Sequence, residues 1–163
     1  MPELSSQIDR RYELLEKLGE GGMGSVYKVR HKELGQMRVV KVIRPHHADD
    51  PQVLERFRRE ARAAIDLRHP NVAQIHDFWI GADGRAFLVM ELIEGLTFQR
   101  LLASRLPPLP LALEMARQAL AALGYLHGKG YLHRDVAPDN LMLTRAYDGK
   151  PAVKLIDLGL IKR

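Results

Sequence analysis

The sequence contains no cysteine among its 163 residues, which excludes disulfides and thiolate metal sites. Aromatic residues make up only 6%, and no aromatic-rich basic stripe accompanies the arginines, so we set aside nucleic-acid binding. No apolar run approaches the roughly 20 residues that a membrane-spanning helix needs. The start, Met1-Pro2-Glu3-Leu4, lacks the charged and apolar regions of a signal peptide. We therefore expect a cytoplasmic chain with no membrane segment in the printed sequence.

The composition is that of an ordinary globular protein, with 46% apolar and 28% charged residues. At this length the chain fits one domain or two small lobes and can bury a hydrophobic core. An excess of 25 Lys and Arg over 20 Asp and Glu gives a net charge of +5. A basic balance of this kind suits an anionic ligand such as a nucleotide.

Strand-like and helix-like patterns are unevenly distributed along the chain. Asp50-Pro51 is typical of a helix start, and the chain before Gly95 is otherwise mostly strand-like, whereas the chain after it is mostly helical. This predicts an α+β fold of two lobes: a lead-in over 1–10, a small lobe over 11–90, a hinge over 91–95 and a large lobe over 96–163. We predict strands over 12–18, 25–30, 39–43, 72–80, 85–90, 141–144 and 153–156, and helices over 51–67 with Asp50 as N-cap, 97–104 and 111–127.

A glycine cluster, Gly19-Glu20-Gly21-Gly22-Met23-Gly24-Ser25-Val26, fits the pattern G-x-G-x-x-G-x-V. Glycines let a backbone approach phosphates closely. A dinucleotide-binding fold would place a helix directly after the cluster, but strand residues follow, so we favour a hairpin. A glycine-rich hairpin without any ligand remains the alternative.

Lys41 lies within a strand of otherwise apolar residues, Val39-Val40-Lys41-Val42-Ile43. Removing a lone ammonium group from water is costly, so this lysine needs a partner. Glu60, on the following helix, is the natural one. The pair is either a structural salt bridge or, if it faces the glycine hairpin, a holder of phosphate oxygens.

Three further polar residues fit a phosphoryl-transfer site. Asp135 precedes Asn140 by five residues on a loop that follows a long helix, and Asp157 follows a predicted strand and precedes Leu158-Gly159. Asp135 can orient a hydroxyl and take its proton, while Asn140 and Asp157 offer the oxygen ligands that Mg²⁺ prefers. Either aspartate alone could be a helix or turn cap, but their combination and order favour catalysis.

Together these motifs resemble a eukaryotic-type protein kinase domain over residues 11–163. The glycine run through Tyr27 is especially similar to bacterial serine/threonine kinases, as are Arg56-Phe57-Arg58-Arg59-Glu60-Ala61 and His69-Pro70-Asn71. The resemblance implies ATP and Mg²⁺ as cofactors, protein substrates with a Ser or Thr acceptor, and transfer of the γ-phosphoryl group.

The resemblance also implies roles for individual residues. Lys41 would contact the α- and β-phosphates and pair with Glu60, Asp135 would be the catalytic base, and Asn140 and Asp157 would bind Mg²⁺. The remaining nucleotide contacts would come from Leu18, Gly19, Gly21, Gly22, Gly24, Val26, Val39, the gatekeeper Met90, the hinge residues Glu91 and Ile93, and Met142.

The sequence departs from the family pattern at several positions. Ala137 stands where serine/threonine kinases usually have a lysine, Val39 replaces an alanine over adenine, and Leu158 replaces a phenylalanine. The printed sequence stops four residues after Gly159, before any Ala-Pro-Glu segment, so we expect these 163 residues alone to phosphorylate no protein substrate efficiently. A non-catalytic, pseudokinase-like nucleotide-binding or scaffold module is the alternative, and a small-molecule phosphotransferase is a third reading.

Overall fold

The computed structural model describes residues 8, 11–21, 24–43, 51–81 and 83–156, without the side chains at 51–54, 56–57 and 60. The chain divides into two compact units. Unit 1 comprises Met1–Asp66 and Ile75–Leu92, and unit 2 comprises Leu67–Gln74 and Ile93–Arg163.

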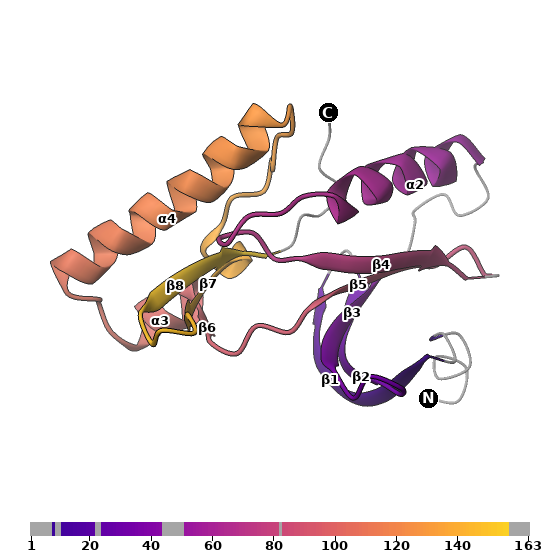
Figure 1. Cartoon of the computed structure of the whole chain (residues 1–163), viewed down its shortest axis with the longest axis horizontal. Coiled ribbons are helices and arrows are strands. Elements are labelled where there is room, and N and C mark those ends of the chain that lie inside the picture. Colours follow the sequence, from indigo (N-terminus) through magenta and orange to yellow (C-terminus); the bar gives the residue numbers. More distant parts are fainter. Residues whose placement is uncertain (1–7, 9–10, 22–23, 44–50, 82, 157–163) are drawn as a thin grey trace. The chain divides into compact units, whose positions relative to one another are not determined.

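Unit 1 is built on a five-stranded antiparallel sheet in the order β1-β2-β3-β5-β4 (Figure 1). The strands predicted over 12–18, 25–30, 39–43 and 85–90 are all present. β1 runs further than expected because its glycines join the ladder to β2. The strands are β1 (Tyr12–Gly21), β2 (Gly24–His31), β3 (Met37–Ile43), β4 (Ile75–Ile80) and β5 (Ala86–Glu91).

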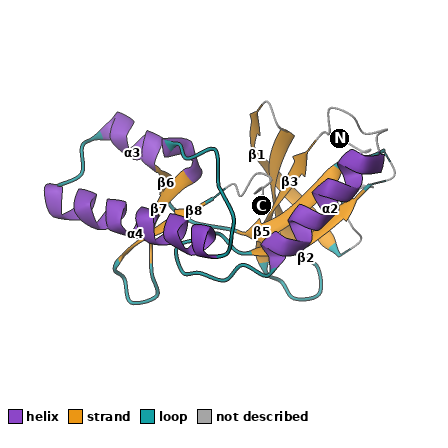
Figure 2. Ribbon diagram, turned by 90° about the horizontal axis from the view of Figure 1, so that it is seen from above, coloured by secondary structure: helices purple, strands orange, loops and turns teal. Residues whose placement is uncertain are grey.

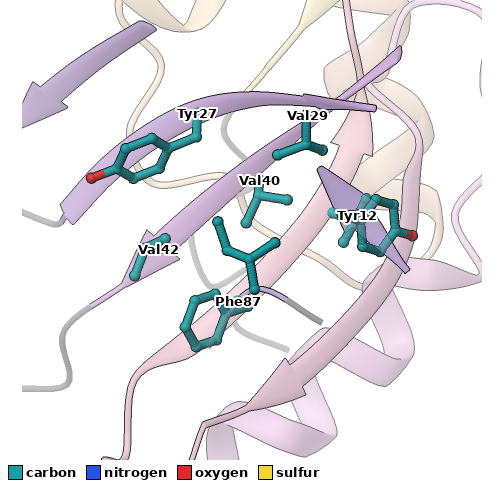
Figure 3. Packing of buried hydrophobic residues seen from close by; sticks show 8 residues of the cluster. Tyr12, Tyr27, Val29, Val40, Val42 and Phe87 are labelled. Atoms are coloured by element: carbon teal, nitrogen blue, oxygen red, sulfur yellow. The ribbon is translucent and has the colours of Figure 1, made fainter. Parts of the chain in front are cut away.

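The core of unit 1 lies on one face of this sheet. Tyr27 and Val29 alternate with less buried residues along β2, because successive side chains of a strand point to opposite faces. Figure 3 shows Tyr27 and Val29 in the same buried cluster as Val40 and Phe87. Trp79 stacks on Phe87 with ring centroids 4.9 Å apart. The buried cluster consists of Ile8, Tyr12, Tyr27, Val29, Val40, Val42, Phe87 and Val89.

The helix α2 (Pro51–Ile65) contacts β4 within unit 1. Ala61 and Ala64, three residues apart and therefore on the same side of the helix, are both buried. The predicted N-cap Asp50 lies outside the described residues. The helix ends at Ile65, two residues before the predicted end at 67.

Unit 2 combines two α-helices with a three-stranded sheet in the order β6-β7-β8. α4 contacts β8, and α3 contacts β6 and β7, so the small sheet lies between the helices (Figure 2). The Thr97 hydroxyl caps α3 by accepting a hydrogen bond from the Arg100 N–H. The elements are β6 (Leu96–Thr97), α3 (Phe98–Ser104), α4 (Leu109–Gly128), the short 3₁₀-helix η1 (Pro138–Asn140), β7 (Leu141–Arg145) and β8 (Pro151–Leu155).

The long helix α4 begins two residues before the predicted position 111. Pro110 lies in its first turn, where a residue without an N–H is tolerated because that group has no partner within the helix. Met115, Ala122 and Leu126 form its buried side. Neither α4 nor any other helix in the described part of the chain has the length and apolar character needed to cross a membrane.

Residues 67–74 pack with unit 2, although the sequence analysis placed them in the small lobe. The Leu155 N–H donates to the Asn71 carbonyl at 2.8 Å, and the Ala73 N–H donates to the Leu155 carbonyl at 2.9 Å. Val72 forms an isolated parallel bridge with Leu155. The strand predicted over 72–80 therefore starts only at Ile75, because β8 satisfies the main-chain groups that precede it.

Candidate active site

The predicted phosphate-binding glycines lie at the hairpin between β1 and β2, where Gly21 pairs with Gly24. Gly24 has a φ of 143°, and a Cβ there would overlap the carbonyl oxygen of Val42, so the position requires glycine. A Cβ at Gly19 would meet nothing within 4 Å. The hairpin therefore packs closely against β3 at Gly24 and leaves open space at Gly19. Gly22 lies outside the described residues.

One face of the unit 1 sheet carries Lys41 and three of the apolar residues predicted to contact adenine. Lys41 lies opposite Val26 on β2, and Val39 lies opposite Met90 on β5. Because side chains alternate along a strand, Val39 and Lys41 share the face that does not form the core cluster. Leu18 falls at an irregularity of β1 and is 45% exposed. The register thus places a cation beside apolar side chains, an arrangement that suits a nucleobase attached to phosphates.

Lys41 is buried at an internal position of β3, with 7% of its surface exposed. An ammonium group at such a position requires a compensating charge or hydrogen bonds. Glu60 falls within α2, but its side chain lies outside the described residues, so the predicted ion pair stays a prediction.

The predicted hinge residues lie where the two units meet along the sequence. Met90 and Glu91 end β5 in unit 1, and Ile93 is the first residue of the long segment of unit 2. Met142 lies on β7 of unit 2, paired with Thr97 of β6. Shared contact of these residues with one adenine ring stays a prediction.

Asp135 and Asn140 are brought together by the loop before β7. The Asn140 side-chain amide donates to the Asp135 carbonyl at 2.8 Å and to the Asp135 carboxylate Oδ2 at 2.9 Å. Asp135 is exposed, whereas Asn140 is 8% exposed. The amide nitrogen therefore holds the carboxylate, and within the described part of the chain the Asn140 side-chain oxygen has no hydrogen-bond donor. A fixed, solvent-facing carboxylate is what a general base needs.

The same loop is fixed at its start by His133, which is 4% exposed. Its Nδ1 accepts from the Asp135 N–H at 3.4 Å, and its Nε2 lies 3.4 Å from the Ile156 carbonyl. These contacts place Nδ1 as the acceptor and Nε2 as the donor of the ring. Between them, Arg134 has a φ of 63°, in the left-handed region that residues with a Cβ rarely adopt.

The end of β8 lies beside Asn140. The Ile156 N–H donates to the Asn140 carbonyl at 2.8 Å, so the residue directly before Asp157 is fixed to the loop that carries Asp135. Asp157 itself lies outside the described residues. In the described part of the chain, no group of three or more His, Asp or Glu side chains gathers as a metal site.

A buried polar network that the sequence analysis missed joins residues 69–71 to α4 and β8. The Gln118 side-chain oxygen accepts from the Val153 N–H at 2.7 Å and from the Asn71 side-chain amide at 2.8 Å. The Gln118 amide donates to the Pro151 carbonyl and to the Glu114 carboxylate. The sequence did offer one signal for this network: Gln118 is a polar residue at the spacing of the buried side chains of an Ala/Leu-rich helix.

Two titratable groups beside this network have altered pKa values. Hydrogen bonds, first from Arg117 and then from Gln118, lower the pKa of Glu114 to about 2. Burial, followed by the charge of Lys154, lowers the pKa of His69. The His69 ring stacks on Tyr125 with centroids 4.9 Å apart.

Comparison with known proteins identifies the arrangement. The family model described as the protein kinase domain matches residues 12–163. The chain belongs to the protein kinase family. It is 37% identical over 167 residues to the serine/threonine-protein kinase PknA of Mycobacterium tuberculosis, covering 99% of this chain and 38% of PknA. It is 41% identical over 160 residues to the probable serine/threonine-protein kinase SCO3848 of Streptomyces coelicolor, covering 96% of this chain and 23% of that protein.

Solved kinase structures share the fold. The crystal structure of the M. tuberculosis PknI kinase domain has a TM-score of 0.78 and 32% sequence identity, with 94% of this chain and 61% of that chain covered. Rad53, crystallised in complex with AMP-PNP, has a TM-score of 0.81 and 26% identity, with 94% and 39% covered. The predicted bacterial-type kinase resemblance and the α+β kinase-like fold are confirmed. The chain spans less than two fifths of the length of PknA and SCO3848.

Proposed function

We propose that the protein containing this chain transfers the γ-phosphoryl group of ATP to serine or threonine side chains of protein substrates. Its relatives are named serine/threonine-protein kinases, which supports this activity. The observation that carries the proposal is the bonding of Asn140 to Asp135, which presents a fixed carboxylate at the motif position of a catalytic base. A cytoplasmic location fits, because ATP is supplied there.

In this proposal, the sheet face of unit 1 binds the nucleotide. Val26, Val39 and Met90 contact the adenine, with Leu18 at the edge of the same surface. Lys41 offsets the charge of the α- and β-phosphates and pairs with Glu60. The glycines of the hairpin leave room for phosphate oxygens to approach main-chain N–H groups.

Mg²⁺ fits the residues at the end of β8 and the adjoining loop. The Asn140 amide nitrogen is already bonded to Asp135, which leaves its oxygen available for a cation. Asp157 would supply the carboxylate, since Ile156 is fixed beside Asn140. When bound, Mg²⁺ neutralises triphosphate charge.

Asp135 would orient the acceptor hydroxyl and accept its proton at a carboxylate oxygen. Phosphoryl transfer depends mainly on positioning and on neutralising charge, so a carboxylate held in place before the substrate arrives lowers the entropic part of the barrier. General-base contributions of this kind are on the order of 10²–10⁴-fold in rate.

Ala137 favours a second candidate function, a nucleotide-binding module without transfer. The serine/threonine family usually places a lysine at this position, beside the transferring phosphoryl group, and alanine supplies no charge there. Such a pseudokinase-like module would bind the nucleotide and act as a scaffold.

Both candidate functions require nucleotide binding, and only the kinase also requires phosphoryl transfer. We expect Lys41→Met to weaken ATP binding by about tenfold or more, because the lost charge-assisted contact is worth about 1.5–3 kcal/mol. Isothermal titration of the chain with ATP and Mg²⁺ measures this. Lys32→Met, an exposed position in a turn of unit 1, is the matched control and should bind as the parent does.

Phosphoryl transfer is tested in the full-length gene product with γ-labelled ATP and a mixture of Ser- and Thr-containing peptides. Asp135→Asn should retain nucleotide binding and lose at least a hundredfold in transfer. Binding without transfer in the parent protein would select the pseudokinase-like module. Failure of the parent chain to bind ATP would refute both functions.

A further inference from the structure

Unit 2 contains an open cavity of about 540 Å³ that the proposed chemistry does not use. It lies where the start of β6 and the end of β7 meet the adjoining ends of α3 and α4. Leu96, Leu111 and Leu143 give it an apolar lining, and Arg105 and Arg145 add two cations. Neither the glycine hairpin nor the loop of Asp135 contributes to it.

The two arginines have donors to offer a ligand. Among the described residues, the Arg105 guanidinium makes no hydrogen bond or ion pair, and it lies on an exposed residue. Arg145 donates through Nη1 to the Gly149 carbonyl at 3.0 Å, which leaves its other N–H groups. Glu94 is the acidic residue of the lining, so two positive charges face one negative charge. Guanidinium groups favour carboxylates, which they bind through paired N–H donors.

The apolar surface extends beyond this cavity. Leu106 and Leu109, on the connection from α3 to α4 and at the start of α4, are 81% and 70% exposed. A second cavity of about 460 Å³ shares Thr144, Arg145 and Pro151 with the first, but its lining holds more charged residues, including Glu114 and Asp148. The exposed Leu106 directly follows Arg105 and continues the apolar lining past that cation, which suits an extended ligand of alternating apolar and acidic character better than a compact small molecule.

We propose that this cavity is a docking site for a segment of the kinase's protein substrate in which leucine-type side chains alternate with carboxylates. The leucine side chains would occupy the space lined by Leu96, Leu111 and Leu143, and the carboxylates would bind Arg105 and Arg145. The inference rests on the proposed kinase function, which makes the partner a protein substrate. It adds a second site on the kinase, which would bind the substrate at a segment remote from its acceptor residue.

A fluorescein-labelled peptide that repeats Glu-Leu-Asp-Leu over 12 residues tests the site by fluorescence anisotropy with the 163-residue chain. We expect saturable binding that weakens by about tenfold with each of Arg105→Glu and Arg145→Glu, because each change removes one charge-assisted contact and adds repulsion. Lys32→Glu, an exposed residue of unit 1, changes the net charge equally and should leave the affinity unchanged. Circular dichroism and ATP titration verify that each variant is folded and binds the nucleotide as the parent does.

Two altered peptides complete the test. Replacing the leucines by serine should abolish binding, and replacing the acids by lysine should do the same. Equal binding of the acidic peptide to parent, Arg105→Glu and Arg145→Glu would overturn the proposal, as would a preference for the lysine peptide. A chain that forms dimers in analytical ultracentrifugation and loses them with Arg145→Glu would show that a second copy is the occupant and would also overturn it. Because nucleotide binding is measured separately, failure of docking is distinguishable from failure of the kinase function.

Discussion

Gln118→Leu removes the side chain that joins three separate segments of unit 2. Gln118 is 8% exposed, and its oxygen accepts from the Val153 N–H at 2.7 Å, where Val153 is 1% exposed. Leaving that buried N–H without an acceptor costs about 1–3 kcal/mol, and the lost bond from Asn71 costs about 1 kcal/mol more. Leucine has a similar volume, so no cavity adds to this loss. We therefore expect the free energy of unfolding to fall by about 2–4 kcal/mol.

Urea unfolding followed by circular dichroism measures the stability, and hydrogen exchange at the Val153 amide measures the local effect. Arg117→Leu is the matched control in the same helix. Its side chain is 68% exposed and its ion pair with Glu114 lies at the surface, so its loss should change the free energy of unfolding much less than Gln118→Leu does. If Gln118→Leu matches this control in stability and leaves exchange at Val153 unchanged, the network does not hold the segments together.

The structure also determines the direction in which two further substitutions change stability. Gly24→Ala should destabilise unit 1 by about 2 kcal/mol or more, because a Cβ there overlaps the Val42 carbonyl and the φ of 143° is strained, whereas Gly19→Ala, with open space around it, should change thermal stability little. The pKa of His69 is lowered from 6.5 by burial and then by Lys154, so the folded state disfavours protonation; its stabilising contribution is complete above pH 6.5 and is lost as the pH falls below it. His69→Phe should therefore lessen the drop in stability between pH 7.5 and pH 5 in urea titrations, and an unchanged drop would contradict the assignment.

Local patterns were enough to predict most strands of unit 1 and to select the candidate site residues, whose roles stay predictions. The strand that holds Lys41 is specified by its own β-branched neighbours, and the glycine hairpin by strand residues on both sides. Asp135 and Asn140 lie close in the sequence, so their contact needs only a short loop. Such features depend on residues near each other along the chain, where periodicity and turn chemistry carry the information.

Features that depend on distant partners were not predictable. Val72 is a β-branched residue and fits a strand, but its neighbours bond to Leu155, which lies far away in the sequence. Gln118 shows only as a polar residue in an apolar helix, and its partners Asn71 and Val153 come from other elements. The periodicity of a sequence indicates which face of a helix or strand is buried, but it does not identify the segments that pack against that face.

The geometry of the Asp135 loop follows from strain that its neighbours compensate. Arg134 occupies the left-handed region at a cost of about 1–2 kcal/mol, which an isolated loop would relieve by changing conformation. The bond from the Asp135 N–H to His133 on one side and the bonds from Asn140 to Asp135 on the other hold that conformation. All of these contacts lie within unit 2, and none requires a ligand. The carboxylate is therefore placed by the fold itself, which is the condition for a base that acts by positioning.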